Sequence, residues 1–273
     1  MNTSEFRARK KSGPPLVCVT AYDTPFAHLA EEAGVDAILV GDSVGRTTLG
    51  YENELPVTID DIARHTAAVK RGAGSTLVIA DLPFMSYVHP DDALRNAATL
   101  VQIGGADAVK LEGGSDLAGI TELLVDRGFA VMAHVGLTPQ TAHRLGGYRL
   151  QGAALSSAQA IVDDTNAQAT AGAFATVLEM LPARLAKSIT AHVAIPTIGI
   201  GAGPDCDGQI QVLHDLLGFS SPALRHTRVF TDVAQLTGKA LRAYAKEVRA
   251  GTFPTEDQSF KGNRGVVNRL TFE

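Results

Sequence analysis

The chain has 273 residues, of which 45% are hydrophobic and 19% charged, with 27 glycines and no tryptophan. This composition is typical of a globular protein with many loops, and a single α/β barrel of about 250 residues fits the length. The formal net charge of −5 argues against general binding to nucleic acid or anionic membranes, because both need clustered Lys and Arg.

Seven short runs rich in β-branched residues predict seven strands, with amphipathic segments between them. The predicted strands cover residues 16–22, 37–42, 76–82, 107–113, 130–136, 174–180 and 196–201. Residues 58–73 predict one of the intervening helices, because Ile59, Ile62, Thr66 and Val69 form an apolar stripe at helical spacing.

The end of the pattern is ambiguous. Residues 209–215 predict an eighth strand, although 209–218 also fits a helix, and a long helix follows over 231–251. Eight alternations of strand and helix favour parallel strands in a single-domain (β/α)8 TIM barrel. We expect an N-terminal extension over 1–15, the catalytic barrel over 16–256 and a C-terminal tail over 257–273.

Targeting and cysteine patterns are missing from the sequence. No apolar run is long enough to span a bilayer and no signal-peptide pattern occurs, so a cytoplasmic protein is expected. Cys18 and Cys206 are isolated in the sequence, which argues against a disulfide framework and against structural zinc. The polar loop 137–152 is the longest interruption and suits a loop over an active site.

Ionisable residues end five consecutive predicted strands. They are Asp42, Asp81, Glu112, His134 and Glu179. The carboxyl ends of parallel strands open onto one face of a barrel, where active sites of this architecture lie, so these side chains should share one rim. Any one acid taken alone could equally cap the next helix, and His134 taken alone is more simply structural.

Strand periodicity adds Lys110 to this rim. Side chains alternate along a strand, so Lys110 and Glu112 share one face, while Val109 and Leu111 share the other and pack against helices. A buried Lys110 needs a counter-ion. The oxygen donors Asp42, Asp81 and Glu112 suit a hard cation, with Mg²⁺ first.

The chain resembles the ketopantoate hydroxymethyltransferase family from about Val19 to Phe260. The resemblance rests on blocks in order, among them GDSVG, ADLPFMSY, VKLEGG, HVGLTPQ, LEMLP and IPTIGIGAG. It implies a (β/α)8 barrel, a homodecamer, Mg²⁺, and transfer of a one-carbon unit from 5,10-methylenetetrahydrofolate to 3-methyl-2-oxobutanoate in pantothenate biosynthesis. Residues 220–230 and the extension 261–273 depart from the family pattern.

The same resemblance implies roles for individual residues. Asp42 and Asp81 resemble acids that hold Mg²⁺ directly or through water and contact the substrate, with Glu112 completing the shell. Ser43 and Lys110 resemble residues that bind the substrate carboxylate. His134 resembles a contact of the keto acid, and Glu179 the general base that takes the C3 proton.

Two other functions remain open from the sequence. One is a Mg²⁺-dependent carbon–carbon lyase acting on another α-keto or 2-hydroxy acid, although the nucleophilic cysteine loop expected of such lyases is not visible. The other is a non-catalytic oligomeric barrel that binds a keto acid or a partner protein, since fold does not fix function.

Overall fold

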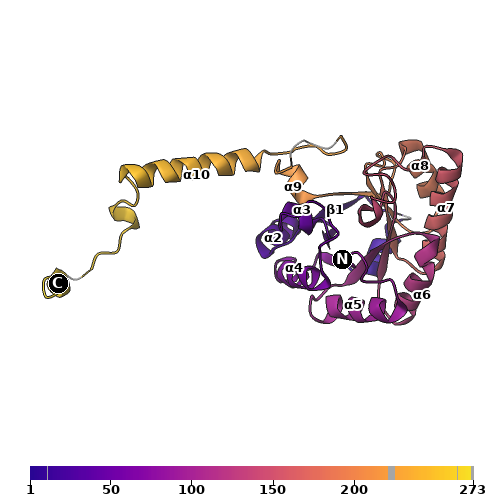
Figure 1. Cartoon of the computed structure of the whole chain (residues 1–273), viewed down its shortest axis with the longest axis horizontal. Helices are drawn as coiled ribbons and strands as arrows, with labels where there is room; N and C mark the ends of the chain where they lie inside the picture. Colours follow the sequence, from indigo (N-terminus) through magenta and orange to yellow (C-terminus); the bar gives the residue numbers. More distant parts are fainter. Residues whose placement is uncertain (11, 221–224, 263, 272–273) are drawn as a thin grey trace.

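In this computed structural model the eight strands form one closed parallel barrel in the order β1 to β8 (Figure 1). The structure describes residues 1–10, 12–220, 225–262 and 264–271. Parts of the predicted extension, of the segment 220–230 and of the tail therefore lie outside the described residues. The predicted TIM barrel is confirmed.

The strands are short and closely follow the predicted runs. Their bounds are β1 Leu16–Thr20, β2 Ala37–Val40, β3 Leu77–Asp81, β4 Ala108–Glu112, β5 Val131–Gly136, β6 Ala175–Glu179, β7 Thr197–Ile200 and β8 Gly208–Gln211. The barrel closes where Leu16 of β1 pairs with Gly208 of β8. The eighth strand is shorter than predicted, because a helical turn already begins at Leu213.

The helices differ in how they contact the barrel. Their bounds are α1 Thr3–Ala8, α2 Thr24–Glu32, α3 Val44–Thr47, α4 Ile59–Gly72, α5 Pro90–Gln102, α6 Ala118–Asp126, α7 Leu155–Thr170, α8 Ala183–His192, α9 Leu213–Leu216, α10 Val233–Ala250 and α11 Arg264–Val267. In Figure 1, α2 and α4 to α8 surround the strands, whereas α10 projects away from them. None of the described helices is long and apolar enough to cross a membrane.

Helix α4 shows why these segments are helical. Thr58 caps its N-terminus by accepting a hydrogen bond from the Asp61 backbone, and the Asp61 side chain accepts one from the Thr58 backbone in return. The predicted apolar stripe is buried at Ile62, Thr66 and Val69. Burial of this stripe holds α4 against the outer face of β2 and β3, which fixes the strands that carry the site.

The N-terminal helix α1 closes the end of the barrel at which the strands begin. Phe6 of α1 is fully buried among inward-facing strand residues and packs edge-to-face on Phe174, with 5.6 Å between ring centroids. The N-terminal extension therefore contributes to the barrel core. It leaves the opposite end, where the strands terminate, open for a site.

We expect Phe6→Ala to lower the free energy of unfolding by about 3–5 kcal/mol, because it removes a fully buried ring and leaves a cavity. Phe260→Ala is the matched control, since Phe260 is fully exposed and its loss should change stability by about 0.5 kcal/mol or less. Urea unfolding of both variants at one protein concentration measures the difference. Equal stability of the two variants would contradict the proposed packing of Phe6.

Candidate active site

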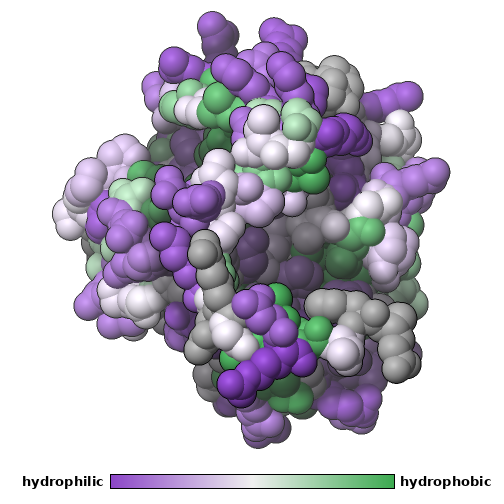
Figure 2. Space-filling view, turned by 90° about the vertical axis from the view of Figure 1, so that its left-hand side faces the viewer, coloured by the Kyte–Doolittle hydropathy of each residue, from purple (hydrophilic) through white to green (hydrophobic). Residues whose placement is uncertain are grey.

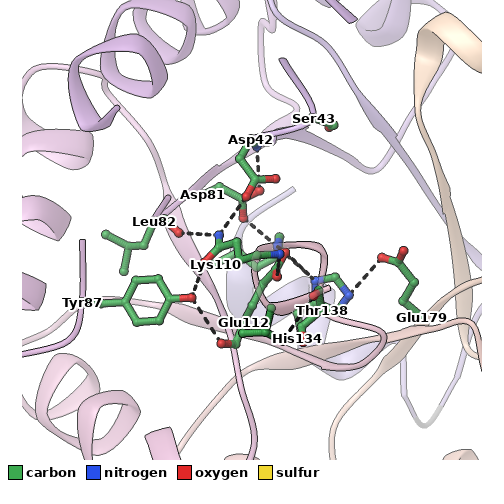
Figure 3. A network of polar contacts seen from close by, with 12 residues as sticks. Asp42, Ser43, Asp81, Leu82, Tyr87, Lys110, Glu112, His134, Thr138 and Glu179 are labelled. Carbon is green, nitrogen blue, oxygen red and sulfur yellow. Dashed lines mark hydrogen bonds and ion pairs between the residues drawn. The ribbon is translucent and has the colours of Figure 1, made fainter. Parts of the chain in front are cut away.

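All the residues that the sequence places at the rim line one cavity of about 690 Å³. They are Asp42, Ser43, Asp81, Lys110, Glu112, His134 and Glu179. Figure 3 shows Asp42, Asp81, Lys110, Glu112 and His134 converging, with Glu179 on the far side of His134. Asp42 lies two residues beyond the end of β2, not at the end itself, but its side chain still reaches the cavity.

Lys110 is the positive centre of this cluster. It is buried, its Nζ lies 2.7 Å from Asp81 Oδ1 and 3.7 Å from Glu112 Oε1, and the outward neighbours Val109 and Leu111 pack against the helices. Burial alone lowers the pKa of Lys110, but the nearby carboxylates outweigh burial and raise it. The ammonium therefore stays charged, and the predicted alternation along β4 is confirmed.

The two aspartates carry charge that Lys110 does not fully offset. The Asp42 backbone donates a hydrogen bond of 3.0 Å to Asp81 Oδ2. Burial, then the charges of Asp81 and Glu112, raise the pKa of Asp42 well above its usual value, and burial also raises the pKa of Asp81. A cation bound beside these carboxylates would lower the repulsion between their negative charges.

Mg²⁺ fits the donor chemistry of these aspartates. The described residues hold no group of three or more His, Cys, Asp or Glu side chains arranged to bind a metal ion. Mg²⁺ is commonly held by one or two carboxylates, with water and substrate oxygens at its other positions. Two buried aspartate side chains at an open cavity match that arrangement.

His134 joins Glu112 to Glu179. Its Nδ1 lies 3.4 Å from Glu112 Oε1, and its Nε2 lies 3.1 Å from Glu179 Oε2. Burial and the Lys110 charge each lower the pKa of His134, but the two carboxylates outweigh them and raise it to about 9. The 3.2 Å contact between Lys110 Nζ and His134 Nδ1 is a hydrogen bond only when the ring has lost the proton from Nδ1.

We expect one histidine to titrate near pH 9, because the folded protein holds the proton of His134 more tightly than the unfolded chain does, whose pKa is about 6.5. The stability that this proton contributes is fully present below pH ~6.5 and is lost as the pH rises through the folded pKa. Nitrogen NMR of ¹⁵N-histidine protein should show this titration, and His134→Gln should remove it. A spectrum in which every histidine titrates below pH ~8 would contradict the assignment.

Ser43 is oriented by a tyrosine that the sequence did not single out. Ser43 makes no side-chain hydrogen bond to cap α3, and its Oγ lies 2.7 Å from the hydroxyl of buried Tyr22. If Tyr22 donates in this pair, the Ser43 proton is free to point into the cavity. Tyr22 ends the LVCVTAY run, where it reads as one more core aromatic residue.

The backbone is unusual next to Glu179. Met180 has φ +51°, a conformation that costs a non-glycine residue about 1–3 kcal/mol and is common at functional sites. Gly136 lies opposite with φ +97°, and a Cβ there would come within 2.4 Å of the Glu179 carbonyl oxygen. The end of β5 therefore needs glycine for β6 to hold Glu179 where it is.

The chain is similar to known proteins along almost its whole length. The family model for ketopantoate hydroxymethyltransferase matches residues 1–256. A 3-methyl-2-oxobutanoate hydroxymethyltransferase of Dehalococcoides mccartyi is 46% identical, covering 98% of this chain and 96% of that protein. One from Thermus thermophilus is 50% identical, covering 92% of this chain and 97% of that protein.

Solved structures support the fold. Phosphonopyruvate hydrolase matches with a TM-score of 0.62 at 15% identity, covering 98% of this chain and 94% of that one. A 2,3-dimethylmalate lyase of the PEP mutase/isocitrate lyase superfamily matches with a TM-score of 0.60 at 15% identity, covering 98% of this chain and 93% of that one. The sequence matches decide the family: the chain is an enzyme that belongs to the ketopantoate hydroxymethyltransferases.

Proposed function

We propose that the chain transfers a hydroxymethyl group from 5,10-methylenetetrahydrofolate to 3-methyl-2-oxobutanoate, giving 2-dehydropantoate for pantothenate biosynthesis. One observation carries the proposal: a buried ammonium and a cluster of carboxylates face one cavity, with Glu179 set apart from the two aspartates. This arrangement separates the groups suited to a cation from a carboxylate suited to proton transfer. The family membership supports the choice of substrate.

The proposed cation is Mg²⁺, held by Asp42 and Asp81 directly or through water, with Glu112 completing the shell. When bound, the cation would withdraw electron density from the keto and carboxylate oxygens of the substrate and so acidify its C3 proton. Ser43 and Lys110 would bind the substrate carboxylate. Lys110 would also offset negative charge that develops near it.

Glu179 would act as the general base. Its carboxylate takes the C3 proton, C3 forms a bond to the methylene carbon of the folate, and both carbon–nitrogen bonds of that methylene break. Water supplies the oxygen of the new hydroxyl group, and the C3 proton and one water proton go to the two folate nitrogens, which releases tetrahydrofolate. His134 holds Glu179 from the side through its 3.1 Å contact and would also contact the keto acid. Because Glu179 remains partly exposed to the cavity, substrate can reach it.

Product formation tests the proposal. Purified protein incubated with 3-methyl-2-oxobutanoate, methylenetetrahydrofolate and Mg²⁺ should form 2-dehydropantoate, detected by mass spectrometry, and omission of folate or cation should abolish it. Folate-independent cleavage of a 2-hydroxy acid would instead support a lyase. Both cysteines argue against that alternative, because burial raises the pKa of the Cys18 and Cys206 thiols and so disfavours a nucleophilic thiolate.

We infer further that copies of the chain associate through α10. No residue of α10 is buried, and its apolar face is exposed at Leu236, Leu241, Tyr244 and Val248. Figure 2 views the molecule from the end at which α10 projects and shows hydrophobic residues among hydrophilic ones. A helix after β8 would ordinarily cover the flank between β8 and β1, where the outward-facing Val17 is 50% exposed.

A second copy is the partner that fits both surfaces, since the described part of each chain offers both the exposed apolar face of α10 and the exposed flank at Val17. The double variant Leu241→Glu, Tyr244→Glu should shift the molar mass measured by light scattering to smaller species, whereas Arg242→Glu on the opposite face of α10 should leave it unchanged. A monomeric wild-type protein would contradict this inference. The decamer and the cytoplasmic location that the sequence favours stay predictions.

A further inference from the structure

Gln140 contacts two carboxylates of the site from outside the barrel strands. It lies in the short helical turn Pro139–Thr141 of the loop after β5 and is almost fully buried. Its side-chain Nε2 donates a hydrogen bond of 2.8 Å to Asp42 Oδ2, and its backbone N donates one of 3.0 Å to Glu112 Oε2. One loop residue thus joins an acid that follows β2 to an acid at the end of β4.

The partners of the Gln140 amide fix which way it faces. The buried Tyr87 hydroxyl lies 2.5 Å from Gln140 Oε1 and 3.2 Å from the Glu112 carbonyl oxygen. The two protons on Nε2 go to Asp42 Oδ2 and to the Leu82 carbonyl oxygen, 3.0 Å away. A flipped amide would place Oε1 against these two acceptors, so they fix the observed orientation, in which the Tyr87 hydroxyl can donate to Oε1. Figure 3 shows Tyr87, Leu82 and Asp42 around this point.

Gln140 holds one carboxylate oxygen of Asp42 and one of Glu112, and so determines where the other oxygen of each points. Gln140 engages Oδ2 of Asp42, and no described residue donates a hydrogen bond to Oδ1, which is left for another partner. Gln140 also engages Oε2 of Glu112, so that Oε1 faces Lys110 and His134. A carboxylate held at one oxygen presents the other in a defined direction.

We propose that Gln140 is a positioning residue whose side chain sets the direction in which Asp42 presents Oδ1 to the cation, while its backbone N–H holds Glu112 with Oε1 toward Lys110 and His134. This inference rests on the proposed function. It adds a residue that need not touch substrate, acting through the two carboxylates.

A second buried glutamine provides a matched control. The amide of Gln168 is fully buried, its Oε1 accepts a 2.6 Å hydrogen bond from Thr121, and its Nε2 donates to the carbonyl oxygens of Gly113 and Gly114. The Gln168 amide therefore makes as many hydrogen bonds as the Gln140 amide, but none of them to a carboxylate of the site. Gln168→Leu should therefore show how much stability is lost when a buried amide is removed away from the site carboxylates.

The test measures Mn²⁺ affinity by calorimetry, together with kcat and KM for exchange at C3, in wild type, Gln140→Leu and Gln168→Leu. We expect Gln140→Leu to weaken Mn²⁺ binding by about 10- to 100-fold and Gln168→Leu to change it by about 2-fold or less. Equal affinities of the two variants would overturn the inference. If Gln140→Leu does not fold, Tyr87→Phe takes its place, with an expected loss of about 3- to 10-fold.

Failure of the two proposals is distinguishable. A wild-type protein that folds but neither binds Mn²⁺ nor exchanges the C3 proton contradicts the proposed function. A wild-type protein that does both, with Gln140→Leu and Tyr87→Phe unchanged in affinity, contradicts only the role of Gln140.

Discussion

Replacing Glu179 with Gln is expected to slow exchange at C3 of 3-methyl-2-oxobutanoate by about 10²- to 10⁴-fold, the usual contribution of a positioned general base. The amide keeps the size of the side chain but cannot take a proton. Because Glu179 lies across the cavity from the aspartates, Mn²⁺ affinity should change by about 2-fold or less, in contrast to the expectation for Gln140→Leu. Proton NMR of the substrate in D2O measures the rate.

Glu52→Gln is the control for this variant. Glu52 also lines the cavity, but it is exposed at the mouth, on the loop after α3, so its loss should leave the exchange rate unchanged. Full exchange by Glu179→Gln would show that another group is the base. A loss of exchange accompanied by a loss of Mn²⁺ binding would show that Glu179 supports the cation.

Replacing Lys110 with Met should lower the free energy of unfolding by about 3–5 kcal/mol at neutral pH, because it leaves Asp81 buried without its positive partner and removes one of the two cations beside Glu112, the other being His134. The folded pKa of Asp81, which burial already raises above the unfolded value of about 4, should then rise further, so the variant loses stability as the pH rises past that value. The deficit relative to wild type should therefore shrink as the pH falls. Urea unfolding at several pH values measures it.

Lys187→Met provides the comparison. The Lys187 ammonium lies 3.1 Å from Asp205 Oδ1, but both side chains are largely exposed, and such a pair is worth about 1 kcal/mol or less. The loss in free energy of unfolding should be several-fold larger for Lys110→Met than for Lys187→Met. Similar small costs for both would mean that the charges of the cavity are solvated, contrary to their burial in the structure.

The sequence predicted the barrel and most of its rim for a simple reason. Parallel strands buried on both faces are continuous apolar runs, so a polar residue at the end of such a run marks the open end of the barrel. Period-two alternation placed Lys110 inside the barrel, and its contact with Asp81 confirms that location. The family resemblance supplied the roles of Ser43 and Glu179, which alternation does not give.

The sequence did not reveal features that depend on chain packing. The apolar pattern over 209–215 predicted one strand, but β8 ends at Gln211 and α9 begins at Leu213, with Val212 as its N-cap residue. The pattern of α10 predicts an amphipathic helix but not that its apolar face stays exposed in the part of the chain that the structure describes. Tyr22, Tyr87 and Gln140 acquire their positions from loops folding onto the site, which no local periodicity encodes.

Exchange of the C3 proton of 3-methyl-2-oxobutanoate in D2O, with and without Mg²⁺, reports on proton removal by Glu179 separately from the folate chemistry. We expect Mg²⁺-dependent loss of the C3 proton signal with wild-type protein and almost no loss with Glu179→Gln. A folded, cation-bound wild-type protein that exchanges no C3 proton under any condition would contradict this expectation.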